Sequence, residues 1–206
     1  MGNAAQCEAA SGLRDPTLHL PLPTAHYLLA TNHYPLPTAM SMFEDSRYRW
    51  RETYFVLFPA NKRPALKSVT KLLSALNKRF ELTNLNADGE GLLDSLTLIS
   101  PDDFAALDIC YTGGGEVLEQ SAVLVDDLKK LGVEGPPPVP WEQIKRYDGR
   151  FDVLHFEQIS ASAEGEAEDD ELLDPSAVWV VLAALAKRTG GVALDPQAGT
   201  FITEED

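Results

Sequence analysis

The chain has 206 residues, 44% of them hydrophobic, and 32 acidic against 17 basic side chains give it a formal net charge of −15. This length and apolar content fit one globular domain with a sizeable core. A net charge of this sign repels phosphate backbones, so we expect no nucleic-acid partner. No run approaches the ~20 apolar residues that a membrane span needs, so we expect no membrane partner either.

Two cysteines, Cys7 and Cys110, are too few for a disulfide framework and fit a reducing compartment. The first residues lack the basic and continuous apolar regions of a signal peptide. We therefore expect a cytoplasmic protein. The strong acidity favours either simple solubility or a protein partner with a basic surface, and the sequence leaves both open.

Residues 1–41 differ in composition from the rest of the chain. They hold only three charged side chains, and five prolines interrupt every helical or strand period. The pentapeptide PLPTA occurs there twice, at 21–25 and at 35–39. We interpret this segment as a disordered tail. It is either native or an upstream extension of a reading frame that truly starts at Met40 or Met42.

Two other interpretations of this segment are weaker. PLPTA resembles the proline-rich ligands that partner domains bind in the polyproline conformation. His19, His26 and His33 are seven residues apart, a spacing that aligns metal ligands only on a continuous helix. Prolines between the first two histidines break such a helix. We therefore predict no metal site and no cofactor.

Regular elements are predicted from residue 42 onward, and we interpret 42–206 as a single α+β domain. The run YFVLF is typical of a central strand, and Leu66, Val69 and Leu73 follow at helical spacing. The predicted elements of the first half are a strand over 51–58, a helix opened by Pro64, a strand over 79–85, an Asp-Gly turn and a strand over 92–100.

Residues 103–112 alternate as in a strand, although Ser100–Asp103 could instead cap a short helix. Beyond them, Gly190-Gly191 ends the most apolar predicted helix. The remaining predicted elements are a helix over 116–131, a proline-rich connector over 132–140, a short helix over 141–147, a strand over 150–159, an acidic loop over 160–174, a helix after Pro175 and a closing hairpin over 192–202.

The order of these elements suggests two β-α-β-β units. One runs from the strand at 51–58 to the strand at 92–100, and the other from the strand at 150–159 to the C-terminus. Two such units most naturally form an antiparallel or mixed sheet with helices packed on one face. We therefore predict an α+β, ferredoxin-like two-layer sandwich.

The best local candidate for a small-molecule site is the turn Thr112, Gly113, Gly114 and Gly115, followed by Glu116. Glycines at a helix N-terminus expose amides that can hold an anion. Against this, Glu116 and Glu119 place negative charge in the same turn, and no Lys-Ser/Thr follows the glycines as in a phosphate-binding loop.

Other candidate residues favour structural roles. His155 and Cys110 both lie in predicted strands, and no nucleophile, metalloprotease or Cys-x-x-Cys motif is present. Adjacent carboxylates, as in Asp102-Asp103 and Asp126-Asp127, do not converge on one point. We therefore predict no catalytic residue.

Two charged stretches remain. The sequence RYRWR at 47–51 mixes arginines with aromatic residues, as single-strand binders do, but a solvated lead-in to the first strand is the better interpretation. The acidic loop has seven carboxylates within 164–174 and lacks the order of an EF-hand. We interpret it as a solvated loop or as the surface for a basic partner.

Three stretches resemble small conserved bacterial α+β proteins of unassigned function: RETYFVLFPANKRPALKSVTKLLSALNKRFELTNL, DDFAALDICYTGGGEVLEQ and TGGVALDPQAGTFI. The resemblance covers roughly 42–206. The ending is similar to that of several α+β families, some of which are thought to be immunity or interaction modules. The resemblance implies a fold and carries no catalytic residue with it.

These observations favour a non-enzymatic α+β domain that binds a protein partner. One alternative is a small-molecule or anion-binding protein or enzyme that uses the turn at 112–116. Another is a structural homo-oligomer that presents a sheet edge.

Overall fold

The structure is a computed structural model that describes residues 42–132, 137–159 and 176–203. The described residues all belong to the second of the chain's two units, 38–206. The tail predicted over 1–41 and the acidic loop predicted over 160–174 lie outside the described residues. So does part of the predicted connector.

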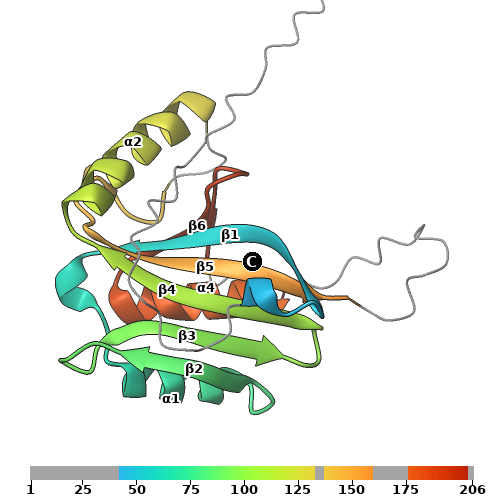
Figure 1. The fold of residues 1–206 in the computed structure, drawn as a ribbon. Helices are drawn as coiled ribbons and strands as arrows, with labels where there is room; N and C mark the ends of the chain where they lie inside the picture. The colour runs from blue at the N-terminus through green and yellow to red at the C-terminus, as the bar shows by residue number, and fades with distance from the viewer. Residues whose placement is uncertain (1–41, 133–136, 160–175, 204–206) are drawn as a thin grey trace, which may run out of the picture. The chain divides into compact units, whose positions relative to one another are not determined.

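The second unit is an α+β fold built on one antiparallel sheet of seven strands in the order β2-β3-β4-β5-β1-β6-β7 (Figure 1). The elements are η1 Met42–Glu44, β1 Tyr48–Phe58, η2 Ala60–Lys62, α1 Leu66–Leu76, β2 Glu81–Ala87, β3 Leu93–Ser100, β4 Ala105–Gly113, α2 Gly115–Leu131, α3 Trp141–Ile144, β5 Gly149–Gln158, α4 Ser176–Thr189, β6 Val192–Asp195 and β7 Thr200–Ile202.

Both β-α-β-β successions are present in the chain, as β1-α1-β2-β3 and as β5-α4-β6-β7. They interlock, because β1 lies between β5 and β6 and pairs antiparallel with both. β5 and β6 therefore run parallel to each other with one strand between them. Residues 105–113 form a strand. Ser100 ends β3, and Pro101–Asp103 lie in the turn between the two strands rather than in a helix.

Helices cover both faces of the sheet, in contrast to the expectation that all of them pack on one face. Val56 and Phe58 of β1 share a buried cluster with residues of α1 and α4. The alternate residues Phe55 and Leu57 are buried with residues of α2 and α3. The reason is visible in the run YFVLF, which is apolar at successive positions and so needs cover on both sides. A ferredoxin-like two-layer sandwich has no such second helical layer.

A close backbone approach joins the end of α4 to β1. A Cβ built on Gly191 would lie 2.1 Å from the Leu57 carbonyl oxygen and 2.7 Å from the Phe58 Cβ. Only glycine fits this contact, which lets β6 follow α4 directly and pair with β1. The Gly-Gly helix end seen in the sequence therefore has a packing reason as well as a conformational one.

Candidate functional site

The glycine-rich turn joins β4 to α2, as the sequence predicts. Gly114 has φ 110°, a conformation that favours glycine, and its N–H donates to the Asp148 carbonyl at 2.8 Å. A Cβ on Gly113 would lie 2.1 Å from the Tyr111 hydroxyl. Gly114 is thus favoured by its backbone conformation, whereas a larger residue at Gly113 would displace the Tyr111 side chain. Gly115 is exposed and opens α2, whose first turn has no side-chain cap.

A partly buried arginine next to this turn, Arg150, has its charge paired within the protein. Arg150 Nε lies 2.8 Å from Asp152 Oδ1, as an ion pair without hydrogen-bond alignment, and Nη1 donates to Gln120 Oε1 at 2.7 Å. Its guanidinium lies 4.5 Å from the centre of the Phe55 ring. Thr112 Oγ1 donates to the same Asp152 carboxylate at 3.0 Å. Anion binding at Thr112–Gly115 stays a prediction, and Arg150 is already neutralised there.

Cys110 and His155 lie on opposite faces of the sheet. Directly paired residues of neighbouring strands share a face of the sheet. Cys110 pairs with Asp152, and Asp152 pairs with Phe55, which is buried on the α2 side. His155 pairs with Leu107, which is buried on the side of α1 and α4. Burial, with nearby carboxylates, also raises the pKa of the Cys110 thiol to about 12. These two residues therefore cannot form a thiolate–imidazole pair.

His155 instead belongs to a polar cluster that the sequence did not reveal. Its Nδ1 lies 3.3 Å from Glu52 Oε1, and Tyr54 is hydrogen-bonded to the same carboxylate. Burial lowers the pKa of His155 and raises that of Tyr54, which contacts Trp179 edge to face. The irregularity in β1 between Trp50 and Glu52 sets the register that places Glu52 opposite His155.

A second polar cluster crosses β2, β3 and β4 on the opposite face. Asn84 Nδ2 donates to Thr97 Oγ1 at 3.1 Å, and Thr97 Oγ1 donates to Asp108 Oδ1 at 2.6 Å. Burial raises the pKa of Asp108, whose carboxylate also accepts the Met42 backbone N–H. Asn84 has φ 49°, so the edge strand is locally irregular where it reaches this cluster. These bonds tie the edge strand and η1 to the sheet.

The two adjacent carboxylate pairs do not converge, as expected from their spacing. Asp102 pairs with Arg79 at 2.8 Å, while Asp103 accepts a hydrogen bond from Ser100. Within 42–132, 137–159 and 176–203, no three His, Cys, Asp or Glu side chains are grouped to hold a metal ion. None of the described helices is long and apolar enough to cross a membrane.

Large apolar side chains are exposed together where β1 begins and β5 ends. The exposed fractions are 63% for Phe43, 44% for Trp50, 51% for Phe104 and 49% for Ile159. The Phe43 ring packs edge-on against Phe156, which is opposite Trp50 in the sheet. The Phe104 carbonyl accepts the Gln158 N–H, and the Ile159 N–H donates to Arg47. We call these four exposed residues the apolar end.

Comparison with known proteins finds no family model, no curated protein and no solved structure that matches the chain. The resemblance to small bacterial α+β proteins therefore stays an expectation. The function has to be argued from the residues of this chain.

Proposed function

We propose that the chain is a non-catalytic protein-binding module and that the apolar end is its docking surface. The observation that carries the proposal is the exposure of Phe43, Trp50, Phe104 and Ile159 at one end of neighbouring strands. Exposed apolar patches of this kind mark interaction sites. Aromatic side chains are also the residues that most often supply binding energy in protein interfaces.

Phe104 supports this proposal through its backbone. It has φ 49°, a conformation that is strained for a bulky residue, yet half of its ring faces solvent. Folding alone would favour glycine or asparagine at this position. Strain held in place to expose an aromatic ring is typical of functional positions.

The charges around the apolar end shape the expected partner. Arg49 and Arg51 both pair with Glu157, at 3.1 and 3.2 Å, and Arg47 pairs with Asp45 at 2.7 Å. Two carboxylates thus offset most of the charge of these three arginines, because Arg49 and Arg51 share Glu157. Their internal pairing supports the interpretation of RYRWR as a solvated lead-in to β1 rather than a nucleic-acid site.

A basic partner would be recognised elsewhere. The described residues hold 19 acidic and 16 basic side chains, a net of −3, so most of the −15 lies in the other residues. Seven of those carboxylates fall within 164–174, and Ile159 of the apolar end is the last described residue before them. We therefore propose a partner surface that combines apolar side chains with basic ones.

Pull-down from lysate with matched variants tests this proposal. Phe104→Gly and Trp50→Ser together should abolish capture of the proteins that the wild-type chain retains. Val123→Ser, which changes an exposed apolar residue on α2, should leave capture unchanged. Phe104→Gly alone should not lower the melting temperature, because glycine adopts φ 49° without strain. Equal capture by the wild type and the double variant would show the proposal wrong.

Anion binding at Thr112–Gly115 is a second proposal, favoured by the uncapped first turn of α2. Thermal-shift measurements with phosphate and nucleotides test it, and the absence of any stabilisation would exclude it.

The homo-oligomer proposal needs a free sheet edge. The irregular β2 edge at Asn84 opposes regular strand pairing, and light scattering that finds a monomer would rule this proposal out.

A further inference from the structure

The outer surface of the α1–α4 layer carries three lysines that pair with no carboxylate of the described residues. The sequence has no acidic residue over 53–80 or over 176–194, although these ranges contain all of α1 and α4. Lys67 and Lys71 of α1, Lys78 in the turn after it and Arg188 of α4 are all exposed. We call these four residues the lysine face.

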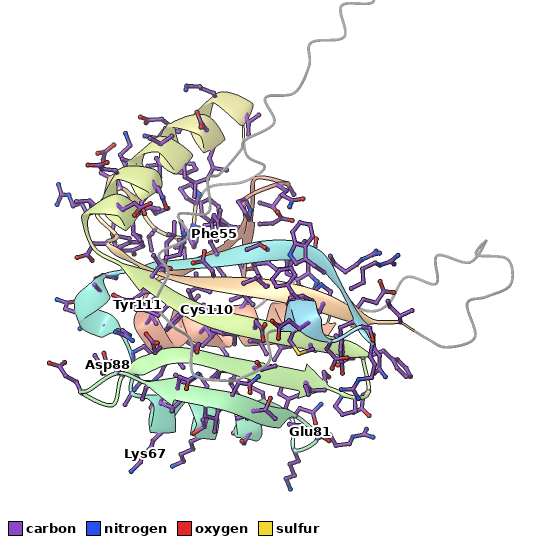
Figure 2. The ribbon with its side chains drawn as sticks, viewed as in Figure 1. Phe55, Lys67, Glu81, Asp88, Cys110 and Tyr111 are labelled. Atoms are coloured by element: carbon purple, nitrogen blue, oxygen red, sulfur yellow. The ribbon has the colours of Figure 1, made fainter. Side chains whose placement is uncertain are left out.

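The packing of α1 fixes the direction of this face. Val69 and Leu73 are fully buried against the sheet and α4, so Lys67 and Lys71 point outward. Figure 2 shows Lys67 projecting from α1 away from the strands. The Arg188 guanidinium donates from Nε and Nη2 to Ser68 Oγ, at 3.0 and 2.9 Å, which holds this cation against α1.

Among the residues that the structure describes, Lys67, Lys71 and Lys78 form no ion pair. Lys67 and Lys71 are one helical turn apart, where two like charges repel. A glutamate at one of these positions would be more stabilising than a second lysine. The absence of a carboxylate partner among the described residues favours an external anion at this stripe.

We propose that the lysine face binds an acidic segment of a partner protein. Complementary charge supplies the recognition, and exposed Leu76 and Val180 on α1 and α4 supply apolar contact. Nucleic acid fits this face less well. The exposed aromatic rings among the described residues are Phe43, Trp50 and Phe104, which come from other elements. Trp179 of α4 is only partly exposed and packs against Tyr54, so α1 and α4 offer bases a poor stacking surface.

The size of the lysine face also favours a short acidic protein segment over a long nucleic acid. α1 has 11 residues and is about 16 Å long, so a short acidic segment can lie within it. A longer polyanion would extend over Glu81, Asp88 and Glu90 on the neighbouring strand and hairpin. This inference concerns a surface separate from the apolar end and does not depend on it.

The test is fluorescence anisotropy with a labelled peptide of about twelve residues, rich in glutamate with interspersed leucine, to match the length of α1. The full-length variant Lys67→Gln/Lys71→Gln/Lys78→Gln should bind it about tenfold more weakly, as expected for the loss of three exposed pairs. The control Lys129→Gln/Lys130→Gln/Lys145→Gln removes the same charge from α2 and its surroundings and should bind nearly as well as the wild type.

Equal loss in both triple variants would overturn the proposal, since net charge alone would then explain binding. Tighter binding of an oligothymidine of similar length would overturn it in favour of nucleic acid. Salt-dependent self-association without peptide binding would overturn it in favour of a second copy of the chain. Melting temperatures of the variants should stay within a few degrees of the wild type, so that loss of binding is not loss of fold. A failure of the Phe104 experiment would leave this test unaffected.

Discussion

The two helical layers on opposite faces of the sheet differ in how far their lysines are paired with carboxylates. Around α2 and α3, Lys129 pairs with Glu142 at 3.6 Å, Lys130 with Asp127 at 3.0 Å and Lys145 with Asp126 at 2.7 Å. On the α1–α4 layer, Lys67, Lys71 and Lys78 form no ion pair with any described residue. Among the described residues, the lysines around α2 and α3 are paired, whereas these three offer their charge to a partner.

The largest effect is expected from substitutions of buried leucines, which test whether both helical layers contribute to the free energy of unfolding. Leu73 of α1 and Leu128 of α2 are buried in separate clusters on the two faces. Replacing either by alanine should lower the free energy of unfolding by about 3 kcal/mol, because each leaves a cavity. Urea denaturation measures both. A loss below about 1 kcal/mol for Leu128→Ala would mean that α2 lies loosely on its face.

A smaller effect is expected at the end of α4. Gly191→Ala should cost about 2 kcal/mol, since its Cβ would overlap the Leu57 carbonyl. Gly190→Ala is the matched control. Gly190 has φ 67° and open space around it, so its substitution should cost only about 1 kcal/mol of backbone strain. Equal losses at the two positions would contradict the close approach of α4 to β1.

The charge difference between the layers predicts that removing a lysine changes the free energy of unfolding in opposite directions on the two layers. Lys71→Glu places a carboxylate one turn from Lys67 and should raise the free energy of unfolding by about 0.3 kcal/mol. Lys145→Gln removes the partner of Asp126 and should lower it slightly, and low salt should enlarge both changes. Thermal melts of both variants at two salt concentrations measure this. A stability decrease for Lys71→Glu would mean that the lysines have internal partners after all.

The smallest effect concerns pH on the α1–α4 side of the sheet. Burial lowers the pKa of His155 despite the nearby Glu52, so the folded protein binds this proton less readily than the unfolded chain. Stability from this group is present at neutral pH and declines as the pH falls below about 6.5. The difference in melting temperature between wild type and His155→Gln should therefore shift between pH 7 and pH 5. A constant difference would contradict the depressed pKa.

Most helices and strands could be predicted, because the spacing of apolar residues and the positions of Gly and Pro at element ends are local signals. The strand at 51–58, the helices after Pro64 and Pro175 and the turn at 112–115 all occur where the sequence places them. Strand order was not predictable, since nothing in a single chain states that β1 lies between β5 and β6. The apolar run in β1 indicates that both faces of the sheet are covered, which a two-layer sandwich does not provide.

Candidate sites were harder to predict than the elements that carry them. The sequence predicts a strand-to-helix turn at the glycines, but it does not show that Gly113 faces the Tyr111 hydroxyl or that Gly114 has a positive φ. The contact between Glu52 and His155 depends on an irregular register, and the exposed ring of Phe104 depends on a positive φ. Neither has a sequence signature.

The position of β1 also has a consequence for how the chain acquires its structure. β1 is synthesised before every other strand that the structure describes, yet Tyr54 pairs with Val153 and Phe55 with Leu194. Its apolar run must therefore wait for almost the whole domain to be synthesised before its neighbours exist. Such long-range pairing slows folding and leaves an aggregation-prone segment uncovered in the meantime. We expect refolding to be slow and truncation before β6 to yield aggregates rather than a smaller folded domain.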